Sequence, residues 1–338
     1  MASHATVGLP PPTPWQRLTR MLDTERETIR YIIFYAILTG IISLSLPLGT
    51  QAVFNLVSTG AVFSQTYILV AVVVGGVLLG GILLVGQMTL VEAIEQRIYA
   101  KAALEYAYRL PRIKAEALEG QNPQELVNRF FDVLTIQKGL MKLLVDIMFA
   151  SLQIIMGVLV LAFYHPIFIA FGLFTILALA LIYVLNYRRA LRTSIEESAY
   201  KYELVDWLEQ VAGRLDEVRH DDTAKNEALG RADGLVSEYL HARNQHFREL
   251  KSYYAYGVAL RTALTAALLI AGTLFVVSRQ MTLGQFVAAE VIIVLISNAI
   301  EKLMTGLNTI FDVLTGVEKV AAVTDLPLDP HHADITHA

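Results

Sequence analysis

The feature that most constrains this chain is a run of 61 residues, from Tyr31 to Val91, that contains no Asp, Glu, Lys or Arg. Two further runs without charge cover residues 147–187 and 262–278. As a single helix, the first run would be about 90 Å long at 1.5 Å per residue. The hydrocarbon core of a bilayer is about 30 Å thick. The first run therefore predicts two membrane-spanning helices joined by a turn, and it excludes an ordinary soluble enzyme.

Turn signals inside these runs set the number of spans. Residues 57–66 combine polar residues with a glycine, and His165-Pro166 interrupts the second run, because proline disfavours helix in the residue before it. Pro47 predicts a kink in the first span, because it lacks a backbone donor. The sequence thus predicts an all-α membrane protein with six transmembrane helices, at about residues 32–56, 67–91, 144–163, 167–186, 257–278 and 282–303.

Basic residues are sorted to one side of these spans. Of the 27 Lys and Arg residues, all but Arg261 and Arg279 precede the first span, lie in the long connections at 92–146 and 187–256, or lie at the end of the sixth span and beyond it, where Lys302 stands at the membrane edge. Positively charged loops stay in the cytoplasm. Both termini and both long connections are therefore predicted to be cytoplasmic.

Composition excludes several classes of function. The net charge of −4 argues against nucleic-acid binding, which needs a basic surface. The absence of cysteine excludes disulfides, thiolate nucleophiles and Cys-ligated metals. The eight histidines show no ligand spacing; His241 and His246, for example, do not share a helix face. We expect no catalytic residue, cofactor or metal in this chain.

The long connections are typical of helices rather than loops. Residues 92–110 are rich in Ala, Glu and Leu, which favour helix, and they continue the second span without a break. Helices predicted at 124–163, 167–205 and 224–278 likewise join a span to a charged extension. Two short breaks separate these extensions, one at residues 110–123 and one from Trp207 through Gly213 to about Asp222.

The ends of the chain differ from this core. Residues 1–14 are rich in proline and predicted to be disordered. Residues 15–30 predict an amphipathic elbow helix on the membrane surface, the alternative being a frayed start of the first span. The transmembrane domain is expected at 31–322, followed by a tail at 323–338.

Several stretches match a known family in their order and spacing. They are Leu46-Pro47-Leu48 with Gln51 to Asn55, Arg109-Leu110-Pro111 with Glu119-Gly120 and Glu125 to Arg129, Leu208 to Gly213, Met281 to Phe286, and Val317 to Val320 through Leu326-Pro327. Over residues 15–327, the chain resembles the transmembrane domain of ABC exporters. It is most similar to haemolysin-type and bacteriocin-type secretion exporters, which tend to have Asp where Asn55 stands.

The resemblance implies a dimer of two such domains, homomeric or heteromeric, in which helices 4 and 5 cross to the partner. It also implies two short coupling segments that bind an ABC ATPase. The residues it assigns to coupling are Arg112, Ile113, Lys114, Glu116, Glu119, Gly120, Asp206, Trp207, Glu209 and Gly213. Trp207 is the expected anchor, because a large aromatic side chain often dominates an interface; packing within its own chain is the alternative.

The sequence itself contains no ATPase. No G-x-x-x-x-G-K-[ST] phosphate loop is present, and Gly75-Gly76 and Gly80-Gly81 lie in an apolar span, where they suit helix packing. We therefore expect ATP and Mg²⁺ to bind a partner ATPase subunit. A truncated chain, or a relative that has lost ATP-driven transport, is also compatible with this observation.

One ionisable residue, Glu290, lies well inside the sixth predicted span. Such a group is a candidate functional site by default, although a local pairing is the alternative. Other polar residues inside spans are candidates for the same substrate pathway or for ordinary bonds between helices: Gln51, Asn55, Gln87, Gln153 and Asn298.

The sequence thus predicts the permease subunit of an ABC exporter, in a bacterial plasma (inner) membrane, and the resemblance implies a periplasmic adaptor as a further partner. The alternative is a degenerate, non-transporting relative with an interaction or regulatory role.

Overall fold

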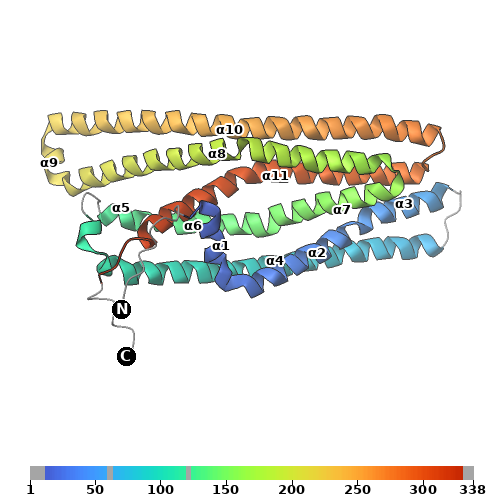
Figure 1. Ribbon diagram of the computed structural model, residues 1–338, viewed down its shortest axis with the longest axis horizontal. Coiled ribbons are helices and arrows are strands. Elements are labelled where there is room, and N and C mark those ends of the chain that lie inside the picture. The colour runs from blue at the N-terminus through green and yellow to red at the C-terminus, as the bar shows by residue number, and fades with distance from the viewer. Residues whose placement is uncertain (1–11, 59–63, 119–122, 330–338) are drawn as a thin grey trace, which may run out of the picture.

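A computed structural model describes residues 12–58, 64–118 and 123–329. These residues form six long helical stretches that run side by side along the longest axis of the molecule (Figure 1). All six are long and apolar enough to cross a membrane: Pro14–Ser58, Ser64–Arg112, Pro123–Tyr164, Ile167–Gly213, Asp222–Val277 and Leu283–Thr324. The predicted number of spans is confirmed.

The first stretch is bent twice. Helix α1 (Pro14–Leu22) is followed by a 3₁₀ turn, η1 (Asp23–Glu25), and then by α2 (Arg26–Ser43) and α3 (Ser45–Ser58). The break between α2 and α3 lies three residues before Pro47, whose ring would clash with the carbonyl of Ser43 in a continuous helix. The predicted kink is confirmed.

Helix α1 begins within the segment that was predicted to be disordered. The Thr13 hydroxyl accepts from the backbone N–H of Gln16, and the Gln16 side chain accepts from the Thr13 N–H, which forms a capping box. The prediction of disorder is therefore wrong for residues 12–14, while residues 1–11 lie outside the described part. The elbow is also shorter than the predicted 15–30, because η1 ends it and α2 already begins at Arg26.

The remaining helices extend well beyond the predicted spans. The second stretch is α4 (Ser64–Arg109), and the third consists of α5 (Pro123–Asn128), α6 (Phe131–Met141), the π-helix η4 (Lys142–Ile147) and α7 (Met148–Tyr164). The others are α8 (Ile167–Gly213), the short α9 (Leu215–His220), α10 (Asp222–Val277) and α11 (Leu283–Thr324). The predicted helical extensions are confirmed.

The second predicted break begins later than expected. Helix α8 continues through Trp207 to Gly213, and the break is confined to Arg214, α9 and Asp221. The sequence before Gly213 is rich in Glu, Leu and Ala, which favour helix, so the chain turns only at the glycine.

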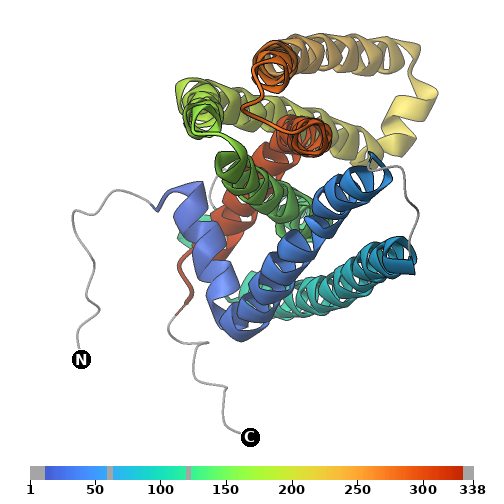
Figure 2. The ribbon, with the colours of Figure 1, turned by 90° about the vertical axis from the view of Figure 1, so that its right-hand side faces the viewer.

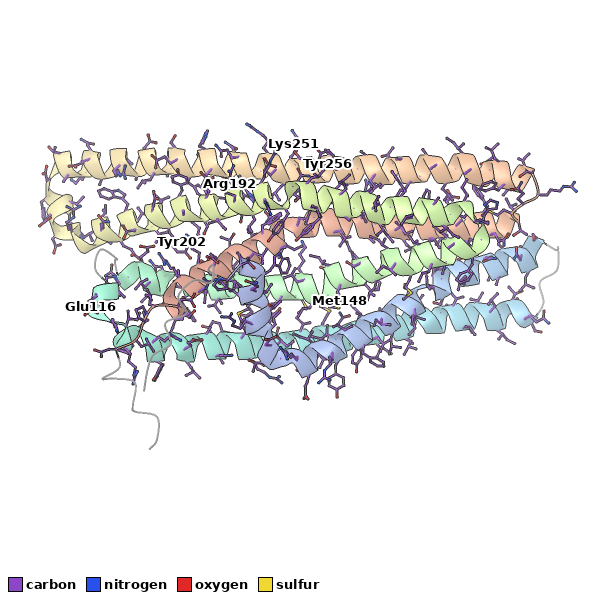
Figure 3. All side chains as sticks on the ribbon, in the orientation of Figure 1. Glu116, Met148, Arg192, Tyr202, Lys251 and Tyr256 are labelled. Carbon is purple, nitrogen blue, oxygen red and sulfur yellow. The ribbon has the colours of Figure 1, made fainter. Side chains whose placement is uncertain are left out.

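The two ends of the bundle differ in composition. One end holds α9 and two 3₁₀ turns, η2 (Leu110–Arg112) and η3 (Ala115–Ala117); we call it the basic end, because the long basic connections lie there. The other end holds the α7–α8 and α10–α11 turns (Figure 1), and we call it the turn end. Arg192 and Lys251 lie near mid-length (Figure 3), so a large part of the bundle lies outside the predicted spans.

Helix α11 forms the centre of the packing. It contacts α1, α3, α6, α7, α8 and α10, and it contributes more buried residues than any other helix described here. Viewed from the turn end, α10 lies at one edge of the bundle and α4 at the opposite edge (Figure 2). Few faces of α11 therefore remain exposed, and the residues on these faces are candidates for a functional site.

Candidate functional site

Helix α11, although it is the most buried helix of the bundle, exposes several polar side chains along one face, with the apolar Val294 among them. Glu290, Asn298, Glu301 and Thr305 are exposed, and their spacing of eight, three and four residues places them on one face. We call these four residues the polar stripe. Glu290 and Asn298 were predicted separately; their common face, with Glu301, could have been found from the helical period.

Of the two acidic residues in the polar stripe, only Glu301 forms an ion pair with another described residue. Arg261 on α10 donates to Glu301 and forms an ion pair with it. Glu290 forms no ion pair within residues 12–58, 64–118 and 123–329. A carboxylate facing lipid at such a depth would cost about 2.5–3.5 kcal/mol on insertion scales. The polar stripe therefore fits a face turned toward water or a partner rather than toward lipid.

Two other pathway candidates lie at the turn end and bridge helices. Gln51 on α3 accepts a 2.7 Å hydrogen bond from the Tyr164 hydroxyl at the end of α7. Asn55 lies so close to α11 that a Cβ at Gly284 would be 2.0 Å from its Oδ1. Gln153 is half-buried on α7. Gln51 therefore fits the alternative reading, that polar residues inside spans join helices, whereas the Asn55 side chain is exposed.

Gln87 does not fit the predicted pathway. It is fully buried, and its Nε2 donates a 2.7 Å hydrogen bond to the carbonyl of Leu144. Leu144 lies in the π-helix η4, where the wider turn disturbs the regular pattern of backbone hydrogen bonds. Gln87 therefore ties α4 to this irregular turn. The sequence shows Gln87 but not the π-helix, which is why its role was missed.

The first predicted coupling segment is tied to the chain that follows α11. Ile113 and Leu328 form an isolated antiparallel β-bridge. The Lys114 N–H donates to the Pro327 carbonyl at 3.0 Å, and the Asp329 N–H donates to the Arg112 carbonyl at 2.8 Å. This connection could not be found from either segment alone.

Around this connection, the basic end has a small hydrophobic core of its own. Tyr106, Leu126 and Val323 are buried together, from α4, α5 and α11. Glu116 in η3 is exposed at the tip (Figure 3), whereas the predicted coupling residues Glu119 and Gly120 lie outside the described residues. The small core holds the ends of these helices together, and Glu116 stays exposed to the surroundings.

The second predicted coupling segment lies in the last turns of α8. The Trp207 indole donates to the Ala228 carbonyl of α10 at 3.2 Å, and Asp206 accepts from Gln210 at 2.7 Å. Trp207 is half-buried, which favours packing within its own chain. Gly213 ends the helix, with open space around it.

The structure places the second predicted coupling segment against α5, the helix that follows the first segment. Asn128, at the end of α5, donates to the Glu209 carboxylate on α8. Deeper in the same end, the Tyr202 hydroxyl donates to Asp132 at 2.5 Å, and Lys201 lies 3.5 Å from the same carboxylate. The sequence does not reveal this buried polar network, because Asp132 and Tyr202 lie far apart in the chain and nothing in the sequence shows that their helices are neighbours.

Comparison with known families identifies the chain. The ABC transporter transmembrane region matches residues 29–213, which is more than half of the sequence. No curated protein matched it. Domains of this kind lie in a membrane and associate with nucleotide-binding domains. The chain belongs to the ABC transporter transmembrane family, as the membrane-spanning component of an ABC transporter.

Proposed function

We propose that this chain is the permease of an ATP-driven exporter and that the polar stripe of α11 lines its substrate pathway. The observation that carries the proposal is Glu290, which is exposed and forms no ion pair within the described ranges, on the helix that contributes most to the core. Arg261 and Glu301 add a second polar position on the same face. A carboxylate at this place favours cargo with a basic or cationic group.

Cysteine labelling tests whether the polar stripe faces water. The chain contains no native cysteine, so single cysteines can be introduced directly. In proteoliposomes, Glu290→Cys and Asn298→Cys should react with a water-soluble maleimide much faster than Leu78→Cys, which is exposed on an apolar face of α4. Equal, slow labelling at all three positions would contradict the pathway and favour the non-transporting alternative.

A transport measurement tests Glu290 itself. Glu290→Gln keeps the size of the side chain and removes its charge, and is expected to reduce ATP-driven export while the complex still assembles. The control, Glu203→Gln, alters an exposed carboxylate on α8 outside the predicted spans. Wild-type export by Glu290→Gln would remove this residue from the mechanism.

We also propose that the basic end is cytoplasmic and binds the ATPase domains, which would bind ATP and Mg²⁺. Two exposed elements support this, η3 with Glu116 and α9 with Leu215. An apolar side chain at an exposed tip suits a groove on a partner. Leu215→Asp is therefore expected to weaken binding of the ATPase, measured by co-purification, whereas Glu227→Gln on the adjoining α10 should not.

The dimer is supported by a second exposed surface. Leu229, Val236, Leu240 and Phe247 follow one another at 7, 4 and 7 residues, which places them on one face of α10. All four are exposed, Leu229 by 70% and Phe247 by 51%. Phe247 lies about 15 Å along the helix from the fifth predicted span, so lipid does not cover this face. We propose that a second transmembrane subunit packs there, in line with exchanged helices 4 and 5.

Light scattering in detergent tests this dimer. Leu240→Asp and Phe247→Asp should shift the purified protein to monomer, because each sets a charge in an apolar contact. Arg231→Asp, on the opposite exposed face of α10, is the matched control. Dimers that persist in both apolar variants, or a wild-type monomer, would contradict the interface.

We also propose the type of exporter, the membrane and the adaptor. The first-span stretch from Leu46 to Asn55 supports an exporter of the haemolysin or bacteriocin type, in a bacterial inner membrane and with a periplasmic adaptor. Peptide or protein cargo follows from that assignment.

A further inference from the structure

A cavity of about 290 Å³ lies beneath the elbow helix α1. Its walls come from α1, η1, α4, α6 and α11, so it closes only when the N-terminal helix lies across the bundle. This volume is close to the lower end of the range for ligand pockets, about 300–1,000 Å³. We call it the elbow pocket.

The elbow pocket is apolar on one side and basic on the other. The apolar side is formed by Ile98, Val133, Ile136, Val317, Val320 and Ala321. Five basic and three acidic side chains line the remainder, which gives this wall a net charge of +2. Such a lining suits an anionic group joined to an apolar part.

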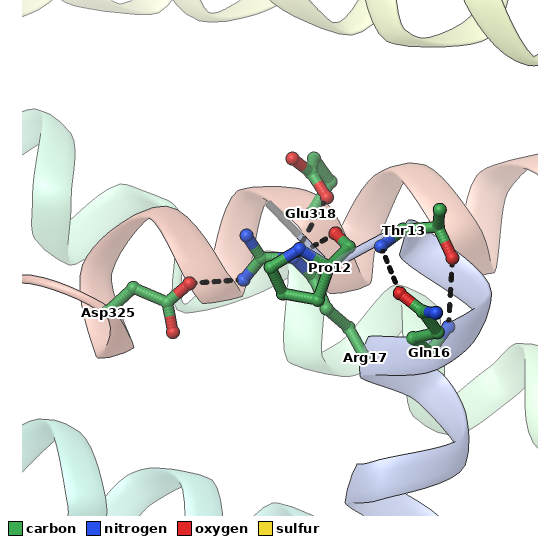
Figure 4. A network of polar contacts seen from close by, with 6 residues as sticks. All are labelled: Pro12, Thr13, Gln16, Arg17, Glu318 and Asp325. Atoms are coloured by element: carbon green, nitrogen blue, oxygen red, sulfur yellow. Dashed lines mark hydrogen bonds and ion pairs between the residues drawn. The ribbon is translucent and has the colours of Figure 1, made fainter. Parts of the chain in front are cut away.

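The acidic residues of the pocket are already engaged. Arg17 forms ion pairs with Asp325, which lines the pocket, and with Glu318, which lies beside it at 3.2 Å (Figure 4). Arg17 also donates a hydrogen bond to the Pro12 carbonyl. Two further pairs are Arg97 with Glu25 at 2.7 Å and Arg109 with Glu105 at 3.0 Å. Each acid of the lining thus neutralises one arginine.

Two cations of the pocket remain. Arg20 on α1 and Lys101 on α4 form no ion pair with any residue in the described ranges, and the Lys101 ammonium donates only to the Thr24 hydroxyl there, at 3.3 Å. They face the same cavity from two different helices. A phosphate between them would gain charge-assisted hydrogen bonds from both sides.

The membrane-proximal edge of the pocket lies close to the layer where phosphate groups are concentrated. On α4 the charge-free run ends at Val91, and Arg97 follows about 9 Å further along the helix. The headgroup layer is about 5–8 Å thick on each side of the hydrocarbon core, and Arg and Lys side chains extend toward it. Lys101 follows about 15 Å past Val91, so its long side chain has to extend back toward the membrane to meet an anionic headgroup at this edge of the pocket.

We propose that the elbow pocket binds the phosphate group of an anionic ligand, which in the membrane is a phospholipid headgroup. Soluble phosphate offers the same chemistry from the aqueous side. The ligand would join α1 to α4 and α11 and so hold the elbow helix in place. This site is independent of the polar stripe, so it stands whether or not the chain exports cargo.

Protection of a single cysteine tests the site. Ala102 lines the pocket, and Ala102→Cys in this cysteine-free chain can be labelled with a maleimide. Nanodiscs containing phosphatidylglycerol should slow the labelling compared with pure phosphatidylcholine. In detergent, inorganic phosphate is the second probe. Protection by phosphatidylglycerol alone identifies a lipid, protection by phosphate alone identifies a soluble ligand, and protection by neither overturns the proposal.

Charge variants make the test specific. Arg20→Gln with Lys101→Gln should weaken protection about tenfold or more, because two charge-assisted bonds are lost. The matched control is Arg30→Gln, a 74% exposed cation on α2 that does not line the pocket. Equal weakening in the control would mean general attraction to an anionic surface and would overturn the site. The Ala102→Cys arm needs no charge change, so it decides the matter even if the double variant misfolds.

Discussion

Replacing Gly139 with alanine tests how closely α6 packs on α11. A Cβ at Gly139 would lie 2.1 Å from Val313 Cγ2 and 3.3 Å from Thr309 Cγ2. Val313 is fully buried, and a β-branched side chain in a helix has one preferred rotamer, so it cannot turn away cheaply. Overpacking of this kind costs about 1–3 kcal/mol. Alanine also favours helix over glycine by about 1 kcal/mol. The net loss in the free energy of unfolding should reach about 2 kcal/mol.

The effect of Gly139→Ala on the free energy of unfolding should change sign once Val313 is shortened. In a Val313→Ala background the clash is absent, and Gly139→Ala should raise the free energy of unfolding by up to about 1 kcal/mol. The two effects differ by about 1–3 kcal/mol, a coupling within the range for residues in contact. Unfolding in SDS, followed by circular dichroism of the purified protein, measures all four variants. Gly230→Ala, with open space around it, is the control and should stabilise in either background. A coupling energy near zero would refute the close approach of α6 and α11.

Two further substitutions test buried hydrogen bonds by the same unfolding measurement. Gln87→Glu should destabilise more than Gln87→Leu, because it removes the donor and sets a carboxylate against the Leu144 carbonyl; the leucine variant should cost about 1 kcal/mol. If Gln87→Leu leaves the stability unchanged, the bond to the π-helix is not formed. Tyr202→Phe should cost about 1.5–3 kcal/mol, because it removes a donor to the buried Asp132 carboxylate. No change on losing that hydroxyl would show that Asp132 is satisfied by other groups.

The spans could be predicted because their signals are local. A long charge-free run, a proline at position 47 and the pair His165-Pro166 each act on the nearest turn of chain. The helical extensions follow in the same way from helix-forming residues. The second break was placed too early, because its start was set at Trp207 although the residues that follow favour helix, and α8 continues to Gly213.

The candidate site was predicted less completely. Glu290 and Asn298 were found because polar residues are rare inside spans, and both are exposed on one face of α11. Gln87 was chosen by the same rule, but it is buried and bonded to Leu144. Leu144 lies in a π-helix, which no residue type in the sequence predicts. Burial of a polar side chain is decided by the neighbouring helix, which a single sequence does not supply.

The bridge between Ile113 and Leu328 also has a consequence for how the chain folds. It joins a residue just after α4 to one just after α11, so it closes a loop that contains the helices from α5 to α10. Closing so long a loop costs entropy that only completed packing can offset. We therefore expect the bridge to form late, so that a partly assembled bundle leaves Arg112 and Lys114 open to a protease such as trypsin. Resistance to cleavage at these two residues would report the completed fold of a newly inserted chain.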